Sequence, residues 1–308
     1  MKYKVIVNPT SGRGTGERSI PHIKAYFESA GLTFDLVRTE RPWHAAELAQ
    51  QAAVDGYDVV VSAGGDGTAN EVINGLMAAK ESGSSAAAMG VLCVGRGNDF
   101  AFSMGIPTDL EAGFQTLIED HRQVIDIGRV TGGLFPEGRY FGNGVGIGFD
   151  AVVGFEALKL KHLHGFTSYI VGALKTIFLY FKAPMVRVIQ DGNEITLPAL
   201  MVSIMNGIRL GGGFMMAPQG APDDGVFDVT LVRQVSRPQM FALITRFMAG
   251  TQAEHEAVQT SRVIKLKATA LNGVLPAHAD GETLCVEGTE LHVELLPQQI
   301  ELINKPRG

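Results

Sequence analysis

Two patterns of apolar and polar residues follow each other along the chain. In the first part, short apolar runs alternate with longer amphipathic runs. The apolar runs "YKVIVN", "LTFDLVR", "DVVVSA" and "MGVLCV" predict strands. The runs between them, residues 19–31, 44–56 and 69–80, predict helices, and the first two close at Gly31 and Gly56. Strands that alternate with helices indicate a parallel sheet covered on both faces.

The pattern changes near Gly128. Beyond it, segments such as "MVRVIQDG", "GVFDVTLVRQV" and "ELHVELL" alternate apolar with polar residues. That period is typical of strands with one packed face and one solvated face. Helices are predicted there for residues 151–163, 164–182 and 237–250. The second part is therefore predicted to be mostly antiparallel β-structure.

We predict two domains from this change, and 308 residues are also more than one domain usually holds. Residues 1–128 should form an α/β domain with a parallel sheet. Residues 129–295 should form an antiparallel β-sandwich. Residues 296–308 are a tail that we expect to pack back on the first domain.

Composition argues against a disordered protein, a broad nucleic-acid binder and a disulfide-rich protein. Apolar residues make up 45% of the chain and charged residues 19%, so disorder is not expected. The formal net charge is −6, whereas broad nucleic-acid binding needs a basic surface. Cys93 and Cys285 both lie in apolar runs. We expect them to be buried free thiols rather than parts of a disulfide framework.

The sequence predicts neither a signal peptide nor a membrane span. Its N-terminus enters a strand-like run at once. The most apolar stretch, residues 165–181, is interrupted by Lys175 and is shorter than the roughly 20 residues that cross a bilayer. We interpret it as domain core, with a membrane-docking helix as the alternative. A cytoplasmic protein is expected.

The run "DVVVSAGGDGTANEVINGL" places a glycine-rich, acidic turn between a predicted strand and a predicted helix. Gly64, Gly65 and Gly67 would let a ligand approach the backbone, and the helix N-terminus favours an anion such as phosphate. Asp66 would repel a phosphate unless a divalent cation lay between them. Thr68 would bond a phosphate oxygen or cap the helix. The alternative is a tight strand-to-helix turn with no ligand.

Two further glycine-rich turns favour a ligand site. "NPTSGRGTG", residues 8–16, follows the first predicted strand, and "VGRGNDFA", residues 94–101, follows the fourth. All three turns lie at the carboxyl ends of predicted parallel strands, so they should converge on one crevice. None of them is a Walker A loop or a full Rossmann fingerprint.

Five motifs together resemble the diacylglycerol kinase catalytic family: "NPTSG", "GGDGTANEVING", "GRGNDFA", "GFMMAPQGAPDDGVFDV" and "ADGE". This family includes bacterial lipid kinases related to sphingosine and ceramide kinases. The GGDGT loop also occurs in NAD kinases and phosphofructokinases, so the combination of motifs carries the resemblance. The resemblance covers nearly the whole chain. It implies that residues 1–128 are the α/β nucleotide-binding domain and that residues 129–295 are the β-sandwich that carries the lipid substrate, with ATP and magnesium as cofactors.

The resemblance also implies which residues of the first domain bind the nucleotide. They are Asn8, Ser11, Gly12, Thr39, Gly64, Gly65, Asp66, Gly67, Thr68, Asn70, Glu71, Arg96, Asn98 and Asp99. Asp66 would take part in a magnesium network, with Asn98, Asp99 and Asp126 as further members. Arg96 stands where the family usually has threonine. It would either face the ATP phosphates or point to solvent.

In the second domain the resemblance makes Asp280 of "ADGE" the general base that accepts the proton of the attacking hydroxyl. By itself the Asp-Gly pair would be a turn between two strands. The segment "GAPDDGVF" is implied to hold a structural magnesium through Asp224 and the backbone carbonyls of Ala221 and Val226. The segment around Met215 and Met216 offers either an acyl-chain site or ordinary core.

We therefore interpret the chain as an ATP- and magnesium-dependent lipid kinase. It would transfer the γ-phosphate of ATP to a lipid hydroxyl, with diacylglycerol as the first choice and phosphatidic acid as the product. An NAD kinase and a non-catalytic nucleotide- or lipid-binding regulator are the alternatives. Expected partners are ATP, a lipid and, transiently, the membrane surface, without nucleic acid. The sequence also allows a homodimer.

Overall fold

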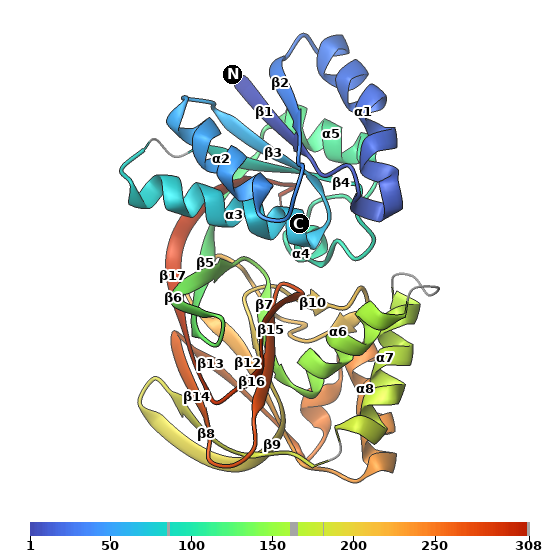
Figure 1. Ribbon diagram of the computed structural model, residues 1–308, viewed down its shortest axis with the longest axis vertical. Coiled ribbons are helices and arrows are strands. Elements are labelled where there is room, and N and C mark those ends of the chain that lie inside the picture. Colours follow the sequence, from blue (N-terminus) through green and yellow to red (C-terminus); the bar gives the residue numbers. More distant parts are fainter. Residues whose placement is uncertain (85–86, 161–165, 181, 307–308) are drawn as a thin grey trace. The chain divides into compact units, whose positions relative to one another are not determined.

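Two compact units make up the chain in a computed structural model (Figure 1). The residues that the structure describes are 1–84, 87–160, 166–180 and 182–306. Unit 1 consists of Met1–Ile127 together with Pro297–Gly308, and unit 2 is Gly128–Leu296. The chain passes between the units within two strands, β5 (Arg122–Gly132) and β17 (Glu290–Ile303).

Unit 1 is built on a parallel sheet with the strand order β2-β1-β3-β4. These strands are β1 (Lys2–Val7), β2 (Thr33–Arg38), β3 (Val59–Gly64) and β4 (Ala88–Cys93). Strands β3 and β4 are buried along their whole length, as their continuous apolar runs predict. The end of β17 extends this sheet in parallel register, with Leu302 beside Met89.

The described part of unit 1 has five helices: α1 (Ser11–Ser29), α2 (His44–Val54), α3 (Asp66–Glu81), α4 (Asp99–Ser103) and α5 (Leu110–Glu119). Helices α1, α2, α3 and α5 contact the strands of the sheet, and α4 contacts α3. Helix α1 begins eight residues before the predicted start, and left-handed backbone angles at residues 12–14 divide it into two parts. Helix α5 was not predicted. Its N-cap residue is Asp109, whose side chain accepts the Ala112 N–H.

Unit 2 is a sandwich of two antiparallel sheets that share the long strand β9 (Asn193–Met205). The first half of β9 pairs with β8, and its second half pairs with β7 and β12. The remaining strands are β6 (Phe135–Phe141), β7 (Gly144–Gly148), β8 (Met185–Gln190), β10 (Arg209–Leu210), β11 (Phe214–Met215), β12 (Phe227–Arg233), β13 (Val258–Val263), β14 (Lys265–Ala270), β15 (Leu275–Ala279) and β16 (Glu282–Gly288).

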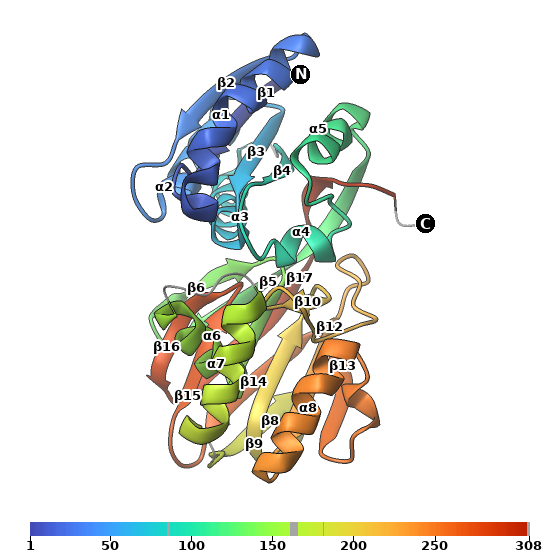
Figure 2. The same ribbon diagram turned by 90° about the vertical axis from the view of Figure 1, so that its right-hand side faces the viewer.

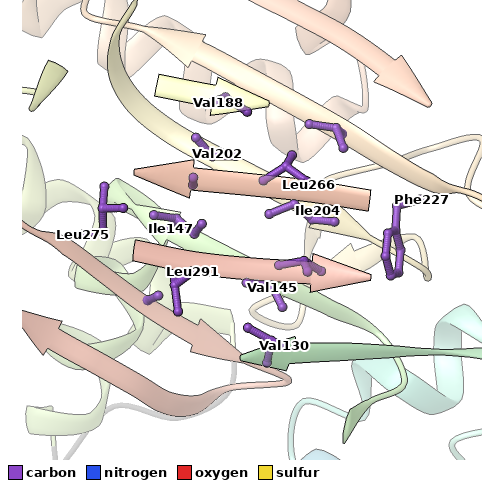
Figure 3. Packing of buried hydrophobic residues seen from close by; sticks show 14 of the residues in the cluster. Val130, Val145, Ile147, Val188, Val202, Ile204, Phe227, Leu266, Leu275 and Leu291 are labelled. Atoms are coloured by element: carbon purple, nitrogen blue, oxygen red, sulfur yellow. The ribbon is translucent and has the colours of Figure 1, made fainter. Parts of the chain in front are cut away.

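The core of unit 2 lies between these sheets. Figure 3 shows the buried side chains of Ile147, Ile204 and Leu266 gathered among strands of both sheets. Phe141 and Phe227 stack in the same core, with ring centroids 5.6 Å apart. The alternating pattern read from the sequence thus points its apolar positions inward. The prediction of a parallel α/β domain followed by an antiparallel sandwich is confirmed.

Three helices of unit 2 lie together beside the sandwich in both ribbon views (Figures 1 and 2): α6 (Phe149–Lys159), α7 (Phe166–Leu179) and α8 (Arg237–Ala249). A single 3-10 turn, Gln252–Glu254, follows α8. Helix α6 begins two residues before the predicted start, and parts of the predicted helices 151–163 and 164–182 lie outside the described residues. Within the described ranges, no helix has the length and apolar content needed to cross a membrane.

Two helix glycines give a matched test of this packing. A Cβ on Gly75 of α3 would lie 2.2 Å from the Ala46 carbonyl oxygen and 2.8 Å from Ala49 Cβ in α2. Gly75→Ala should therefore lower the free energy of unfolding by about 1–3 kcal/mol, measured by urea denaturation. A Cβ on Gly154 of α6 would meet no atom within 4 Å. Gly154→Ala should raise it by about 0.5–1 kcal/mol. A neutral Gly75→Ala would contradict the close approach of α2 and α3.

Candidate functional site

Three glycine-rich loops meet at the carboxyl ends of β1, β3 and β4 in unit 1. We call residues 8–16, 64–68 and 94–99 the glycine cradle. The Gly64 carbonyl accepts hydrogen bonds from the N–H groups of residues 94 and 95 at 3.0 and 2.9 Å. A Cβ on Gly65 would lie 3.2 Å from Gly95 Cα. The loops approach so closely that side chains at these glycines would separate them.

Asn8 ties the first loop to the second. Its Nδ2 donates to Thr68 Oγ1 at 3.1 Å, and its Oδ1 accepts from the N–H and the hydroxyl of Thr10 at 3.1 and 2.9 Å. Thr68 is buried in the first turn of α3. Two of the predicted nucleotide-binding residues therefore hold the cradle together.

Ser11, Asn98 and Arg96 border the cradle in different ways. Seen from a Cβ built on Gly65, Ser11 Oγ is 3.6 Å and Asn98 Oδ1 is 3.9 Å away. Asn98 is left-handed, with φ of 52°, and is the N-cap residue of α4. Arg96 is exposed in the third loop.

Thr39 and Asn70 follow β2 and lie within α3, respectively. The Thr39 N–H donates to the Val7 carbonyl at 2.9 Å, which places Thr39 beside the start of the first loop. Asn70 is buried in α3, two residues after Thr68, and its backbone carbonyl accepts from Asn74 Nδ2 at 2.8 Å.

Asp66 opens α3 and faces the third loop. Its Oδ1 accepts the Phe100 N–H at 2.9 Å. A Cβ on Gly97 would lie 2.8 Å from Asp66 Oδ2 and 3.7 Å from Asp99 Oδ2, so both carboxylates border this glycine. Burial, together with the Asp66 carboxylate, raises the pKa of the Cys93 thiol to about 12. Cys93 therefore stays a thiol at neutral pH, and both cysteines are free and buried as predicted.

The two carboxylates at Gly97 suit a hard divalent cation. Magnesium is usually bound by one or two carboxylates together with substrate phosphates, rather than by a cage of protein ligands. In the part of the chain that the structure describes, no three His, Cys, Asp or Glu side chains are grouped to hold a metal ion. Asp66 and Asp99 could therefore hold magnesium when phosphate oxygens complete its coordination.

Two other carboxylates predicted for this site have structural partners. Glu71 Oε2 accepts the Ala45 N–H at 3.0 Å, in the first turn of α2, where a negative charge also suits the helix dipole. Asp126 Oδ1 accepts the Gln298 N–H at 2.7 Å and is almost completely buried. Asp126 thereby fixes the C-terminal segment that returns to unit 1.

Asp224 has an ion-pair partner in unit 2. Its Oδ2 pairs with Arg262, and its Oδ1 accepts the Val226 N–H at 3.3 Å. The Asp224 carboxylate therefore has a positive partner without a metal ion. The structural magnesium at Ala221, Asp224 and Val226 stays a prediction.

Asp280 forms the turn between β15 and β16. The φ angles of Asp280 and Gly281 are 49° and 85°, as in the two-residue Asp-Gly hairpin turn. Its Oδ2 accepts the Gly142 N–H at 2.8 Å, and its Oδ1 accepts the N–H groups of Asn143 and Gly144 at 3.0 and 2.8 Å. The buried carboxylate is thus held in one orientation by the loop that precedes β7.

Two residues that the sequence analysis did not identify lie beside Asp280. His278 of β15 has its Nε2 3.5 Å from Asp150 Oδ2, and its Nδ1 accepts the Gly281 N–H at 3.3 Å. Burial lowers the pKa of His278, but the carboxylates of Asp150 and Asp280 raise it by more, so the net shift is upward.

A pocket lies among α6, α7, α8 and the strands they cover. It holds about 540 Å³ of space free of protein atoms, part of it open to solvent. Its walls are apolar and include Val153, Leu200, Met216 and Phe247. Asp150 is the one charged residue among the described residues that line it. Met216 is both buried core and pocket wall.

Comparison with known proteins identifies both parts of the chain. Residues 2–130 match the diacylglycerol kinase catalytic domain, and residues 143–304 match the YegS C-terminal NAD kinase beta sandwich-like domain. A diacylglycerol kinase of Staphylococcus aureus (strain JH9) is 31% identical over 272 residues, which are 88% of this chain and 81% of that protein. The chain belongs to the diacylglycerol kinase catalytic family. The resemblance predicted from the motifs is confirmed.

Other relatives agree with membership in the diacylglycerol kinase catalytic family. The diacylglycerol kinase of S. aureus (strain bovine RF122 / ET3-1) is 30% identical over 282 residues, covering 91% of this chain and 86% of the relative. As a family member, the protein is a kinase that transfers phosphate to an alcohol group.

Solved structures share the fold of this diacylglycerol kinase family member. A diacylglycerol kinase from Bacillus anthracis str. Sterne has a TM-score of 0.75 at 21% identity, covering 99% of this chain and 97% of that one. Yeast NADH kinase complexed with NADH has a TM-score of 0.50 at 11% identity, covering 99% and 84%. At these identities the likeness concerns the fold alone.

Arg96 gives a test of the cradle in this diacylglycerol kinase family member. If its guanidinium meets an ATP phosphate, Arg96→Ala should weaken ATP binding by about 1.5–3 kcal/mol, the range for hydrogen bonds to charged groups. Arg96→Thr, which restores the usual family residue, should recover much of this loss. Calorimetric titration of both variants with ATP measures the effect. Unchanged affinity in Arg96→Ala would show that the side chain points to solvent.

Proposed function

We propose that the protein uses ATP and magnesium to phosphorylate the hydroxyl of a membrane lipid, with diacylglycerol as the first substrate. The observation that carries the proposal is the apolar pocket of unit 2, whose wall includes Asp150 and which belongs to the same unit as Asp280. An apolar pocket with a carboxylate in its wall suits an acceptor that has an acyl body and one hydroxyl.

The glycine cradle supports the nucleotide half of this proposal. Its backbone N–H groups and the N-terminus of α3 favour the phosphates of ATP, and Arg96 would add a positive charge. Magnesium, bound with the nucleotide, neutralises charge that develops on the transferred phosphoryl group. Asp66 and Asp99 would orient that ion against the phosphates.

The pocket favours a lipid over NAD as the acceptor. NAD requires polar partners for two ribose rings and a pyrophosphate. The pocket offers instead apolar side chains such as Leu200, Met216 and Phe247. The likeness to yeast NADH kinase concerns the fold and does not bear on the acceptor.

The outer faces of α7 and α8 favour contact with a membrane surface. Phe178 and Leu179 are each 63% exposed at the end of α7, and Met248 of α8 is 42% exposed. The Arg237 guanidinium lies 5.6 Å from the centre of the Phe178 ring. Exposed apolar residues beside a cation suit the interface of an anionic bilayer. The lipid would thus be taken up by a protein that contacts the membrane transiently.

Asp280 is proposed to accept the proton of the lipid hydroxyl as it attacks the γ-phosphorus. Such general-base help is typically worth ~10²–10⁴-fold in rate. Because three N–H groups donate to this carboxylate, Asp280→Asn also replaces one of their acceptor oxygens by a donor. A variant at this position therefore tests the base and the turn together.

Asp66→Asn is a cleaner test of the magnesium role. Asparagine keeps an oxygen for the Phe100 N–H but removes the charge. We expect the variant to stay folded and to lose magnesium-dependent turnover, because the ion loses a carboxylate ligand. Circular dichroism and ATP turnover across a magnesium titration, on the same sample, measure both effects. Wild-type turnover at every magnesium concentration would refute a metal role for Asp66.

Transfer of radiolabelled γ-phosphate tests the acceptor. The wild-type protein is given a panel of extracted lipids in mixed micelles, with NAD as a competing acceptor and Asp66→Asn as the matched control. We expect labelled phosphatidic acid from diacylglycerol, and no label on NAD. Label on NAD with none on any lipid would replace this proposal by an NAD kinase activity.

A further inference from the structure

Asp150, His278 and Asp280 form a continuous series of contacts inside unit 2. Asp150 stands in the first turn of α6 and lines the apolar pocket. Its Oδ2 lies 3.5 Å from His278 Nε2. The opposite nitrogen of the ring, Nδ1, accepts the Gly281 N–H at 3.3 Å, and Gly281 shares the hairpin turn with Asp280.

The hydrogen bond from Gly281 defines how the imidazole is oriented. Because Nδ1 accepts this hydrogen bond, the hydrogen of the neutral ring lies on Nε2, the nitrogen that is 3.5 Å from Asp150 Oδ2. One side of His278 therefore holds the turn, and the other side faces the Asp150 carboxylate in the first turn of α6. The ring and the Asp150 carboxylate are both largely buried, so neither has bulk water as an alternative partner.

Strand β7 leaves room for this pair by having glycine at position 146. A Cβ there would lie 2.0 Å from Asp150 Oδ2 and 2.5 Å from His278 Nε2. Any side chain at this position would displace both groups. A buried polar pair normally contributes little net stability compared with apolar residues of the same size. Its presence beside the turn of Asp280 thus points to a role in the reaction.

We propose that Asp150 and His278 are positioning residues for Asp280, so that the first turn of the helix lining the lipid pocket holds the turn that carries the base. This inference rests on the proposed function, because it assigns Asp280 to the reaction. Neither Asp150 nor His278 exchanges a proton with substrate in this scheme. They fix where the Asp280 carboxylate stands, and a displacement of about 1 Å can cost on the order of 10²-fold in rate.

Two substitutions of His278 separate its two contacts. Asparagine places its oxygen near the position of Nδ1, where it can still accept the Gly281 N–H, but it does not reach Asp150. Glutamine places its amide near the position of Nε2, where it can still donate to Asp150, but it leaves the Gly281 N–H without its acceptor. We expect kcat on diacylglycerol to fall roughly 10- to 100-fold in His278→Gln and less in His278→Asn. The dissociation constant for ATP should not change in either variant.

Gly146→Ala and Cys285→Ala complete the experiment. Gly146→Ala displaces the pair while leaving both of its members in place, and it should lower kcat as His278→Gln does. Cys285 is buried in β16 of the same hairpin, and its Sγ donates to the Leu275 carbonyl at 3.1 Å. Cys285→Ala should lower the melting temperature and leave kcat within about twofold of wild type. Equal kcat in wild type and both His278 variants, or a loss in Cys285→Ala as large as in His278→Gln, would overturn the positioning role.

Hydrogen exchange keeps this test separate from that of the function. In His278→Gln, the amides of residues 142–144 and 281 should exchange faster than in His278→Asn, because the turn has lost its anchor. If the wild-type protein transfers phosphate to no lipid, the proposed function fails, and faster exchange still supports the contact series. Unchanged exchange in His278→Gln would overturn the inference whatever the activity.

Discussion

Carboxylates that accept backbone N–H groups join distant segments of the chain in both units. Asp66 accepts the N–H of Phe100, Asp126 accepts that of Gln298, and Asp280 accepts N–H groups of the loop before β7. A buried or half-buried carboxylate is costly unless such donors surround it. Each carboxylate therefore requires the segment that donates to it, and it holds that segment in place. The glycine cradle and the Asp280 turn take their shape from this mutual dependence.

Contacts also distinguish acidic residues of unit 1 that the sequence analysis assigned to the same nucleotide and magnesium site. Asp66 and Asp99 each place a carboxylate oxygen beside Gly97, and we propose that this pair holds magnesium when phosphate oxygens complete its coordination. Glu71 and Asp126 accept hydrogen bonds from the backbone of α2 and of the returning C-terminal segment. Asp66 also accepts a backbone N–H, and it differs from them in having the Asp99 carboxylate beside the same glycine.

Much of the fold could be predicted from the sequence, because the apolar and polar pattern within most helices and strands indicates their type. The apolar runs of β3 and β4, with glycine-rich loops after them, predict a parallel sheet and the place where its loops meet. Pairings between distant residues gave no such signal. Asp150 and His278 are 128 residues apart, and neither residue's neighbours predict the contact. Asp224 lies in an acidic turn and forms an ion pair with Arg262 of β13, a contact that the residues around the turn do not predict.

Strand β17 has a consequence for how the protein is made. Its last residues lie beside β4, and Gln298 is the partner of Asp126, so unit 1 includes a segment synthesised after the whole of unit 2. Domains usually fold in the order in which they leave the ribosome. Here the unit that is translated first lacks its outer strand until the unit translated second has already emerged. A nascent chain therefore cannot complete the glycine-loop unit before the sandwich that accompanies it has had time to fold.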